Sequence, residues 1–201
     1  MDFQFTPEEA AERNYAVTLD QPPRTGDVGS YNALWFDRGE VSSDRRTSLI
    51  VDPPDGRLPV KPETQEQAAA QRDYRRAHPG DSWLDRSNWD RCITYHGVPP
   101  ISTGYNNTYQ ILQTADYVAI RVENIHDVRI IPLDGRAQLD DGVRQWNGDS
   151  RGHWEGDTLV VETANFSDQT VHRFPSSRNT KAVERFRVVS KDRIDYQFTI
   201  E

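Results

Sequence analysis

Seven short segments between residues 108 and 200 alternate apolar and polar side chains, and this pattern constrains the fold more than any other feature. They are TYQILQT, YVAIRVE, DVRIIPL, VRQWNGD, DTLVVETANF, VERFRVVS and DRIDYQFTI. Asp, Gly, Asn and Lys-Asp turn residues separate them, a spacing typical of consecutive antiparallel strands. We therefore predict a mainly β fold, in which an antiparallel meander forms a curved sheet or a partly closed barrel.

The last two segments show the alternation best. An apolar face is predicted from Phe186, Val188, Ile194, Tyr196, Phe198 and Ile200. The opposite face is predicted from Arg185, Arg187, Asp195, Gln197 and Thr199. An uncovered apolar strand at a sheet edge tends to recruit another chain, so a homodimer or higher oligomer through the C-terminal strand region is expected.

Residues 1–90 have a different texture and are predicted to form a helical and extended arm that packs on the β core of residues 91–201. TPEEAAER begins a helix with Thr6 as its N-cap and Pro7 in the first helical position. ETQEQAAAQRDYRRAH, residues 63–78, has acids early and bases late and ends before Pro79. TSLIV is expected to be a short strand, and DPPDGR a tight turn.

Charge and composition exclude several classes of function. The net charge of −8 disfavours a phosphate backbone as a partner, so no nucleic acid is expected. No apolar run reaches the length of a membrane span, and the N-terminus lacks the apolar region of a signal peptide, so the chain as written is expected in the cytoplasm. Cys92 is the only cysteine, and its strand-like surroundings favour a buried structural thiol.

The stretch VENIHDVRIIPLDGR, residues 122–136, places Glu123, His126, Asp127 and Arg129 in strand-forming sequence. If Asn124-Ile125 is a two-residue turn, Glu123 and His126 face each other as a cross-strand pair. A carboxylate beside an imidazole is a plausible general acid–base unit, because histidine titrates near neutrality and the carboxylate raises its basicity. Arg129 would stabilise an anion. The alternative is a hairpin end with a satisfied histidine.

The stretch WNGDSRGHWEGD offers further candidates in what is expected to be sharply folded backbone. Arg151 is an alternative anion stabiliser, and His153 a second candidate catalytic residue. Ser150 with His153 suggests a nucleophile and a base, but no G-x-S-x-G elbow occurs in the chain. Trp146 and Trp154 either line a ligand pocket or fill the core.

Candidate ligand-binding residues lie outside these two stretches as well. Tyr105, Asn106 and Asn107 can hold a carbonyl or a hydroxyl, or else the Asn pair simply tolerates left-handed backbone. Arg46 either binds a substrate carboxylate or pins a loop through a nearby Asp. The five histidines follow no metal-binding spacing, and no phosphate or dinucleotide fingerprint occurs, so no metal and no cofactor are expected.

Long runs of the chain from about residue 29 onward resemble a large, uncharacterised bacterial family whose members are often exported. The runs are GSYNALWFDRG, RRTSLIVDPPDGRLP, HPGDSWLDRSNWDRC, GYNNTYQILQT, IHDVRIIPLDGR, RQWNGDSRGHWEGDTLVVETANF and VERFRVVSKDRIDYQFTIE. The resemblance implies no catalytic residue, since no function of the family is known. Members usually begin with an export signal and continue beyond the point at which this chain stops.

Two functional hypotheses follow from the sequence. The first is a cofactor-independent acid–base enzyme of the lyase, isomerase or hydrolase type, acting on a small organic molecule in a β-barrel pocket. In it, His126 is the base, Glu123 its partner, and Arg129 or Arg151 the anion stabiliser. The second is a non-catalytic module for small-ligand binding or assembly, whose charged residues only fix turns.

Overall fold

A computed structural model describes residues 4–18, 39–95, 97–125, 127–169 and 178–201 of the chain. The chain divides into two compact units. Unit 1 comprises Met1–Tyr74 and Thr103–Asn106, and unit 2 comprises Arg75–Ser102 and Asn107–Glu201. The boundary predicted from the sequence lies after residue 90, whereas residues 75–90 belong to the unit that contains the strands.

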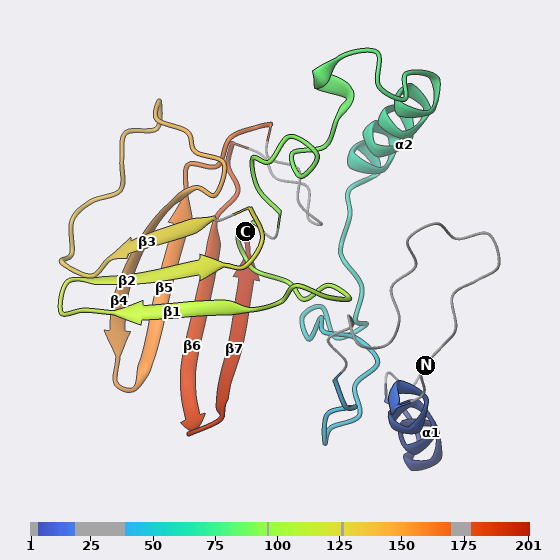
Figure 1. The fold of residues 1–201 in the computed structure, drawn as a ribbon, viewed down its shortest axis with the longest axis vertical. Coiled ribbons are helices and arrows are strands. Elements are labelled where there is room, and N and C mark those ends of the chain that lie inside the picture. Colours follow the sequence, from blue (N-terminus) through green and yellow to red (C-terminus); the bar gives the residue numbers. More distant parts are fainter. Residues whose placement is uncertain (1–3, 19–38, 96, 126, 170–177) are drawn as a thin grey trace. The chain divides into compact units, whose positions relative to one another are not determined.

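Unit 2 contains two antiparallel sheets, so the predicted mainly β fold is confirmed (Figure 1). The first sheet has the order β1 (Tyr109–Gln113), β2 (Tyr117–Val122), β3 (Val128–Pro132). The second has the order β4 (Asp149–Glu155), β5 (Thr158–Ala164), β6 (Ala182–Ser190), β7 (Arg193–Ile200). The strands form two separate meanders and no closed barrel, because β3 and β4 belong to different sheets.

The two sheets pack face to face, with the strands of one running across those of the other (Figure 1). Alternate residues of β2 point inward, as the period of two requires, whereas β5 is buried at three consecutive positions. The buried cluster between the sheets takes residues from both: Val118, Ile120, Ile131, Leu159 and Val161. Burying side chains of this size stabilises the fold by roughly 1.5–3 kcal/mol each.

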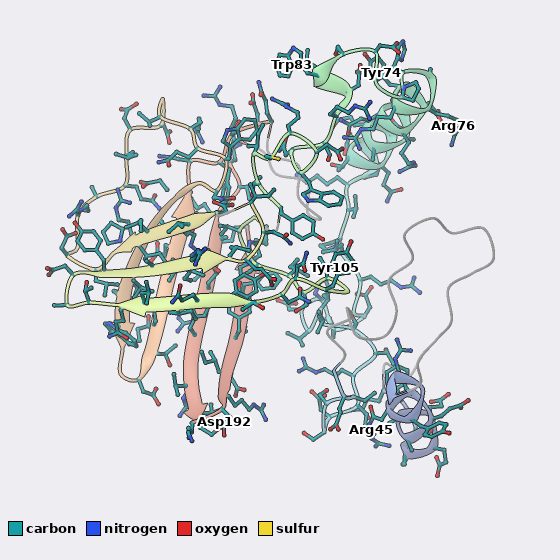
Figure 2. The ribbon with its side chains drawn as sticks, in the orientation of Figure 1. Arg45, Tyr74, Arg76, Trp83, Tyr105 and Asp192 are labelled. Atoms are coloured by element: carbon teal, nitrogen blue, oxygen red, sulfur yellow. The ribbon has the colours of Figure 1, made fainter. Side chains whose placement is uncertain are left out.

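The β6–β7 hairpin confirms the predicted alternation and turn. Phe186 lies opposite Tyr196, and Val188 opposite Ile194. The chain reverses at residues 191–192, and Asp192 lies at the tip of the hairpin (Figure 2). Toward this tip the apolar face is left uncovered, since Val188 is 67% exposed.

The stretch GDSRGHWEGDT does not form the expected run of turns; most of it is strand β4. Gly152 permits close packing here, because a Cβ at this position would lie 2.9 Å from Ile131 Cγ2 on β3. Sharp turns occur only at its two ends, at Gly148 before β4 and at Gly156 in the β4–β5 connection, where φ is 68° and 62°. The predicted strand VRQWNGD is also wrong, since residues 143–148 form turns with a single bridge at Gln145.

Two helices precede the strands, as predicted: α1 (Pro7–Thr18) and α2 (Pro62–Ala77). A short 3₁₀ turn, η2 (Trp83–Asp85), follows α2. Thr6 caps α1 reciprocally with Glu9. The Glu9 N–H donates to Thr6 Oγ1 at 3.1 Å, and the Thr6 N–H donates to Glu9 Oε2 at 2.8 Å. In the parts of the chain that the structure describes, no helix has the length and apolar character needed to cross a membrane.

Two local expectations from the sequence are wrong. TSLIV forms no strand. The Ser48 hydroxyl accepts a bond from the Ile50 N–H and donates to the Gly56 carbonyl at 2.9 Å. These local bonds bend the segment toward the turn that follows it. Cys92 is exposed rather than buried. Its φ of 53° and the bond from its N–H to the Trp89 carbonyl place it in a turn instead of a strand.

Candidate functional site

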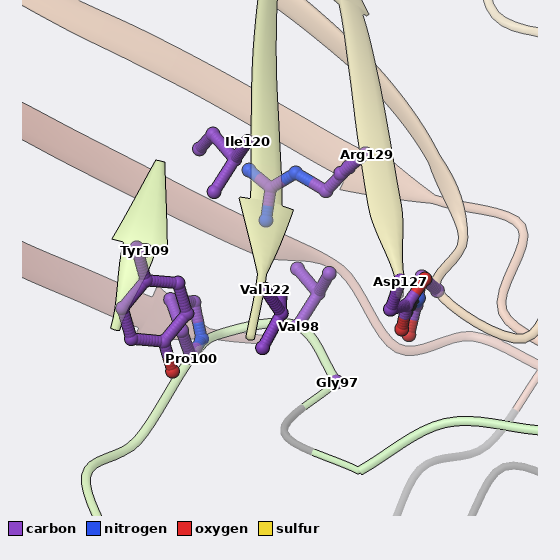
Figure 3. Close-up of a pocket in the computed structure, with 9 residues that line it drawn as sticks. Gly97, Val98, Pro100, Tyr109, Ile120, Val122, Asp127 and Arg129 are labelled. Carbon is purple, nitrogen blue, oxygen red and sulfur yellow. Dashed lines mark hydrogen bonds between the residues drawn. The ribbon is translucent and has the colours of Figure 1, made fainter. Parts of the chain in front are cut away.

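A small hollow in unit 2 lies beside the connection between β2 and β3, and we call it the β2–β3 hollow (Figure 3). Its volume is about 20 Å³, whereas one water needs about 10–15 Å³ by the same measure. The hollow therefore admits a water or the compact end of a larger molecule. It is lined by Gly97, Val98, Pro100, Tyr109, Ile120, Val122, Asp127, Arg129 and Asn147.

The β2–β3 connection brings Asp127 to the hollow. The Val122 N–H donates to the Asp127 carbonyl at 2.8 Å, and the Asp127 N–H donates to the Asn124 carbonyl at 3.4 Å. Ile125 has a φ of 62°, a conformation that is rare for a β-branched residue. The turn thus extends from Asn124 to Asp127 and is wider than a two-residue turn at Asn124-Ile125.

The carboxylate of Asp127 is held through one of its oxygens. Oδ2 accepts a bond from Asn147 Nδ2 at 2.7 Å and one from the Thr94 hydroxyl at 3.1 Å. Thr94 is buried, with 3% of its surface exposed. No described residue donates to Oδ1 of Asp127. The segment before β1 and the loop before β4 therefore orient this carboxylate and leave one oxygen available.

Arg129 on β3 forms an ion pair with Glu184 on β6, between the two sheets. Arg129 Nη2 lies 2.5 Å from Glu184 Oε2, and Nη1 lies 3.2 Å from Oε1. The Tyr196 hydroxyl donates to the same Oε1 at 2.9 Å. The side chains of Arg129 and Glu184 are 10% and 0% exposed. A buried pair of this kind requires two good bonds and further partners to offset the loss of water.

The third nitrogen of the Arg129 guanidinium, Nε, is left without an acceptor. Its Nε is buried and has no hydrogen-bond acceptor among the described residues. A buried donor without a partner costs about 1–3 kcal/mol. Arg129 lines the hollow, but its Nε has no accessible surface, so this unpaired donor lies within the packed interior behind the wall (Figure 3).

Two buried phenols belong to the same region. Burial, with a smaller contribution from Tyr95, raises the pKa of Tyr109 to about 12. Burial, together with the charge of Glu184, also raises the pKa of Tyr196 well above its usual range. Both hydroxyls are therefore protonated at neutral pH, and the Tyr109 ring forms part of the wall of the hollow.

The predicted acid–base pair is only partly described. His126, and with it the pairing with Glu123, lies outside the described residues. Glu123 is exposed, and its Oε2 accepts a bond from the Thr108 N–H at 3.4 Å. Its own N–H donates to the Thr108 carbonyl at 3.0 Å. Glu123 therefore extends the pairing of β2 with the chain before β1, and it does not line the hollow.

The candidates on and beside β4 lie away from the hollow. Arg151 bonds to Asp149 Oδ1 at 2.6 Å and to the Ala137 carbonyl at 3.0 Å, so it fastens β4 to the preceding loop. His153 is exposed, and its Nε2 lies 3.4 Å from Glu155 Oε1. Trp154 is largely exposed and Trp146 is half-buried. None of the four lines the hollow.

The remaining candidates are divided between the units. Arg46 lies in unit 1, forms an ion pair with Asp44, and makes an isolated bridge with Gln4. Tyr105 and Asn106 belong to unit 1, whereas Asn107 belongs to unit 2. Asn106 has a φ of 58°, which asparagine tolerates better than most residues. The structure thus does not gather these four residues at the β2–β3 hollow.

Sequence reasoning missed Glu184 and Tyr109, although the pattern held a signal for the first. Glu184 lies two residues before Phe186 on β6, and Arg129 lies two residues before the buried Ile131 on β3. Each charged residue therefore points to the same face as that apolar residue. A charged residue on the apolar face of a strand requires a partner, so one acid and one base on two such faces indicate a buried ion pair. No comparable signal marks Tyr109.

Comparisons of the chain with protein-family models, curated proteins and solved structures gave no match. The resemblance to an exported bacterial family therefore stays a prediction. Within the described residues, no group of three or more His, Cys, Asp or Glu side chains is placed to hold a metal ion.

Proposed function

We propose that unit 2 binds a small organic molecule at the β2–β3 hollow. The hollow itself carries this proposal, because the Asp127 carboxylate is held in place at its wall and one oxygen of that carboxylate receives no bond from a described residue. A ligand that supplies a hydrogen-bond donor can bond to this oxygen. Val98, Ile120 and Val122 add an apolar wall, and a mainly apolar wall with few polar groups is usual for ligand sites.

A fragment titration followed by NMR tests this function. Amide signals of Val98, Ile120 and Asp127 are expected to shift together when a fragment binds. Val122→Phe narrows the hollow and should abolish these shifts, while Val128→Phe, the same change at an exposed position of β3, should leave them intact. Fragment binding that survives Val122→Phe, or a panel that never shifts these signals, contradicts the proposal.

Acid–base chemistry at the β2–β3 connection, beside the hollow, is a second candidate, favoured by Oδ1 of Asp127, which receives no bond from a described residue. In this proposal His126 is the base. Its carboxylate partner is Glu123, or else Asp127, which follows His126 in the sequence. Arg129 would hold the substrate oxygen, since Arg151 is already bonded to Asp149 and to the Ala137 carbonyl. The reaction class is that of a cofactor-independent lyase, isomerase or hydrolase.

Proton exchange tests the second candidate without knowledge of the substrate. A carbonyl fragment that binds the hollow is incubated with the protein in deuterated water, and its carbon-bound protons are followed by NMR. An acid–base enzyme should replace the proton beside the carbonyl, and His126→Ala should stop the exchange while His78→Ala does not. Equal exchange in the wild type and in His126→Ala would contradict the acid–base proposal and would not affect the binding proposal.

We also propose a homodimer through the C-terminal strand region. Among the described residues, β7 pairs only with β6, so its other edge is open. The apolar cross-strand pair Val188 and Ile194 lies exposed near the hairpin tip. Two copies related by a two-fold axis could pair their β7 edges and cover these side chains.

Light scattering tests the dimer. The wild type should show about twice the chain mass of 23.1 kDa at micromolar concentration. Ile194→Asp should return the protein to the monomer mass, and Val128→Asp, which changes an exposed valine on the other sheet, should not. A wild type that remains monomeric at every concentration contradicts the dimer.

A further inference from the structure

We infer that the group of the ligand that enters the β2–β3 hollow is a primary ammonium. The inference rests on the proposed binding function and adds the chemical class of the ligand. It follows from the charge of the wall, from a shortage of hydrogen-bond donors at Asp127, and from the size of the hollow.

The first step is the charge of the wall. Arg129 is bound through two nitrogens to Glu184, which offsets its positive charge. The Arg129 side chain reaches from β3 toward β2, away from the Asp127 carboxylate (Figure 3). Asp127 receives its bonds from the neutral side chains of Thr94 and Asn147, and it forms no ion pair with a described residue. Because the other lining residues are uncharged, the described wall carries one uncompensated negative charge, which attracts a cation and repels an anion.

The second step is the supply of hydrogen-bond donors at this carboxylate. Asn147 Nδ2 donates to Asp127 Oδ2 at 2.7 Å. The Thr94 hydroxyl lies 3.1 Å from Asp127 Oδ2 and 3.2 Å from Asn147 Oδ1, and its single proton serves one of them at a time. The described residues thus donate two bonds to a group of three oxygens, and Asp127 Oδ1 receives neither of them. An ammonium supplies three donors and no acceptor, so it fits a wall that is rich in acceptors.

The third step is the size of the hollow. Its volume is about 20 Å³, and one water needs about 10–15 Å³ by the same measure. A primary ammonium is nearly as compact as a water, whereas a trimethylammonium carries the same charge with three methyl groups around the nitrogen and no N–H. The apolar side chains of Val98, Ile120 and Val122 can contact the carbon chain that carries the ammonium.

Three probes with the same isobutyl group test this class: isobutylammonium, isobutanol and isobutyltrimethylammonium. They are titrated by NMR at constant ionic strength and about pH 8, where an alkylamine is charged and histidine is ordinarily neutral. Isobutylammonium is expected to bind about tenfold more tightly than isobutanol, since a hydrogen bond between charged groups is stronger than one from a neutral donor. It is also expected to bind more tightly than the trimethyl compound, which has the charge but donates no bond.

A charge variant locates the preference. Asp127→Asn removes the negative charge and should reduce the preference for isobutylammonium over isobutanol by about fivefold or more, because an amide attracts a cation less than a carboxylate does. Asp116→Asn, the same change on the β1–β2 turn, should leave the ratio unchanged. Ratios, rather than affinities, are compared, so a modest loss of stability does not obscure the result.

The possible outcomes distinguish the two levels of the proposal. If fragments shift the signals of the hollow but isobutanol or the trimethyl compound binds as tightly as isobutylammonium, the ligand class is overturned and the binding function stands. The ligand class is also overturned if the preference is the same in Asp127→Asn as in the wild type. If no fragment shifts these signals, the binding function itself fails.

Discussion

β6 carries Glu184 and Arg185 at adjacent positions, and the two residues show how an ion pair differs between the two faces of one sheet. Glu184 has no exposed side-chain surface and binds Arg129 of the other sheet. Arg185 is 43% exposed and binds Glu155 at 2.7 Å on the outer face. Successive residues of a strand point to opposite faces, so a single step along the chain separates interior from solvent.

Bond length alone does not decide how much an ion pair contributes to the free energy of unfolding. The inner pair and the outer pair both have good geometry. When one partner of the inner pair is lost, a charge remains buried, and nothing in the interior replaces the lost bonds. When one partner of the outer pair is lost, water solvates the other, and exposed pairs contribute little to stability.

Loss of Glu184 is expected to have the largest effect. Glu184→Ala should lower the free energy of unfolding by about 3–5 kcal/mol, because it leaves the Arg129 guanidinium buried without its carboxylate. Denaturant unfolding followed by fluorescence measures this change. Glu155→Ala, which removes the acid of the outer pair, is the matched control and should change the unfolding midpoint little.

A double variant tests whether buried charge is the cause. Arg129→Met combined with Glu184→Leu replaces both members by apolar side chains, and it should recover most of the stability lost in Glu184→Ala. A double variant as unstable as the single one would instead assign the loss to packing around Tyr196, whose hydroxyl bonds to Glu184.

Two neighbouring isoleucines on β3 sharpen the comparison with apolar side chains. Ile131 is fully buried, and Ile130 is 54% exposed on the opposite face. Ile131→Ala should cost about 2–5 kcal/mol of unfolding free energy through the cavity that it leaves between the sheets. Ile130→Ala should cost much less, and equal losses in calorimetric melting would contradict the assignment of the faces.

The strands could be predicted from the sequence because their signal is local. The apolar side of the β6–β7 hairpin can be predicted from its alternate residues, which are Phe186, Val188, Ile194 and Tyr196. In the structure, Phe186 lies opposite Tyr196 and Val188 opposite Ile194. The division into two sheets could not be predicted, since no local pattern states that β3 and β4 pair with different partners. β4 itself was missed because glycine is typical of turns, whereas Gly152 serves close packing against Ile131.

The candidate site was harder to predict because its parts lie far apart in the chain. Asp127 was recognised as a charged residue, but its partners Thr94 and Asn147 are 33 and 20 residues away, in segments without regular structure. Arg129 was predicted to stabilise an anion. Its pairing with Glu184, 55 residues later, could be predicted only from the fact that each residue lies on the apolar face of its own strand, in different sheets.

Gly152 tests how tightly the interior faces are packed. Gly152→Ala places a Cβ within 2.9 Å of Ile131 Cγ2, and overpacking of this kind is expected to cost about 1–3 kcal/mol. Gly39→Ala is the control, because nothing lies within 4 Å of its added Cβ. The difference in denaturation midpoint measures the effect, and a Gly152→Ala protein as stable as Gly39→Ala would show that the sheets can separate freely.

The raised pKa of Tyr109 predicts a loss of stability at alkaline pH. Below about pH 10 the phenol is protonated in both states, whereas between about pH 10 and pH 12 only the unfolded chain releases the proton. Unfolding is therefore favoured as pH rises through this window. Tyr109→Phe should show a shallower decline in unfolding free energy than the wild type, and Tyr15→Phe, at a residue 65% exposed, should show the same decline as the wild type.

The smallest effect is expected at the outer pair of β6. Hydrogen bonding from Arg185, and then from His153, lowers the pKa of Glu155, so any stabilisation is present at neutral pH and is lost as pH falls through that lowered value. Both partners are exposed, and salt screens their attraction. Glu155→Gln should shift the unfolding midpoint barely beyond experimental error, and the shift should vanish in high salt. A double-mutant cycle with Arg185→Gln measures the coupling. A coupling as large as that between Arg129 and Glu184 would show that the solvent face of this sheet is shielded from water, and the contrast between the two faces would no longer hold.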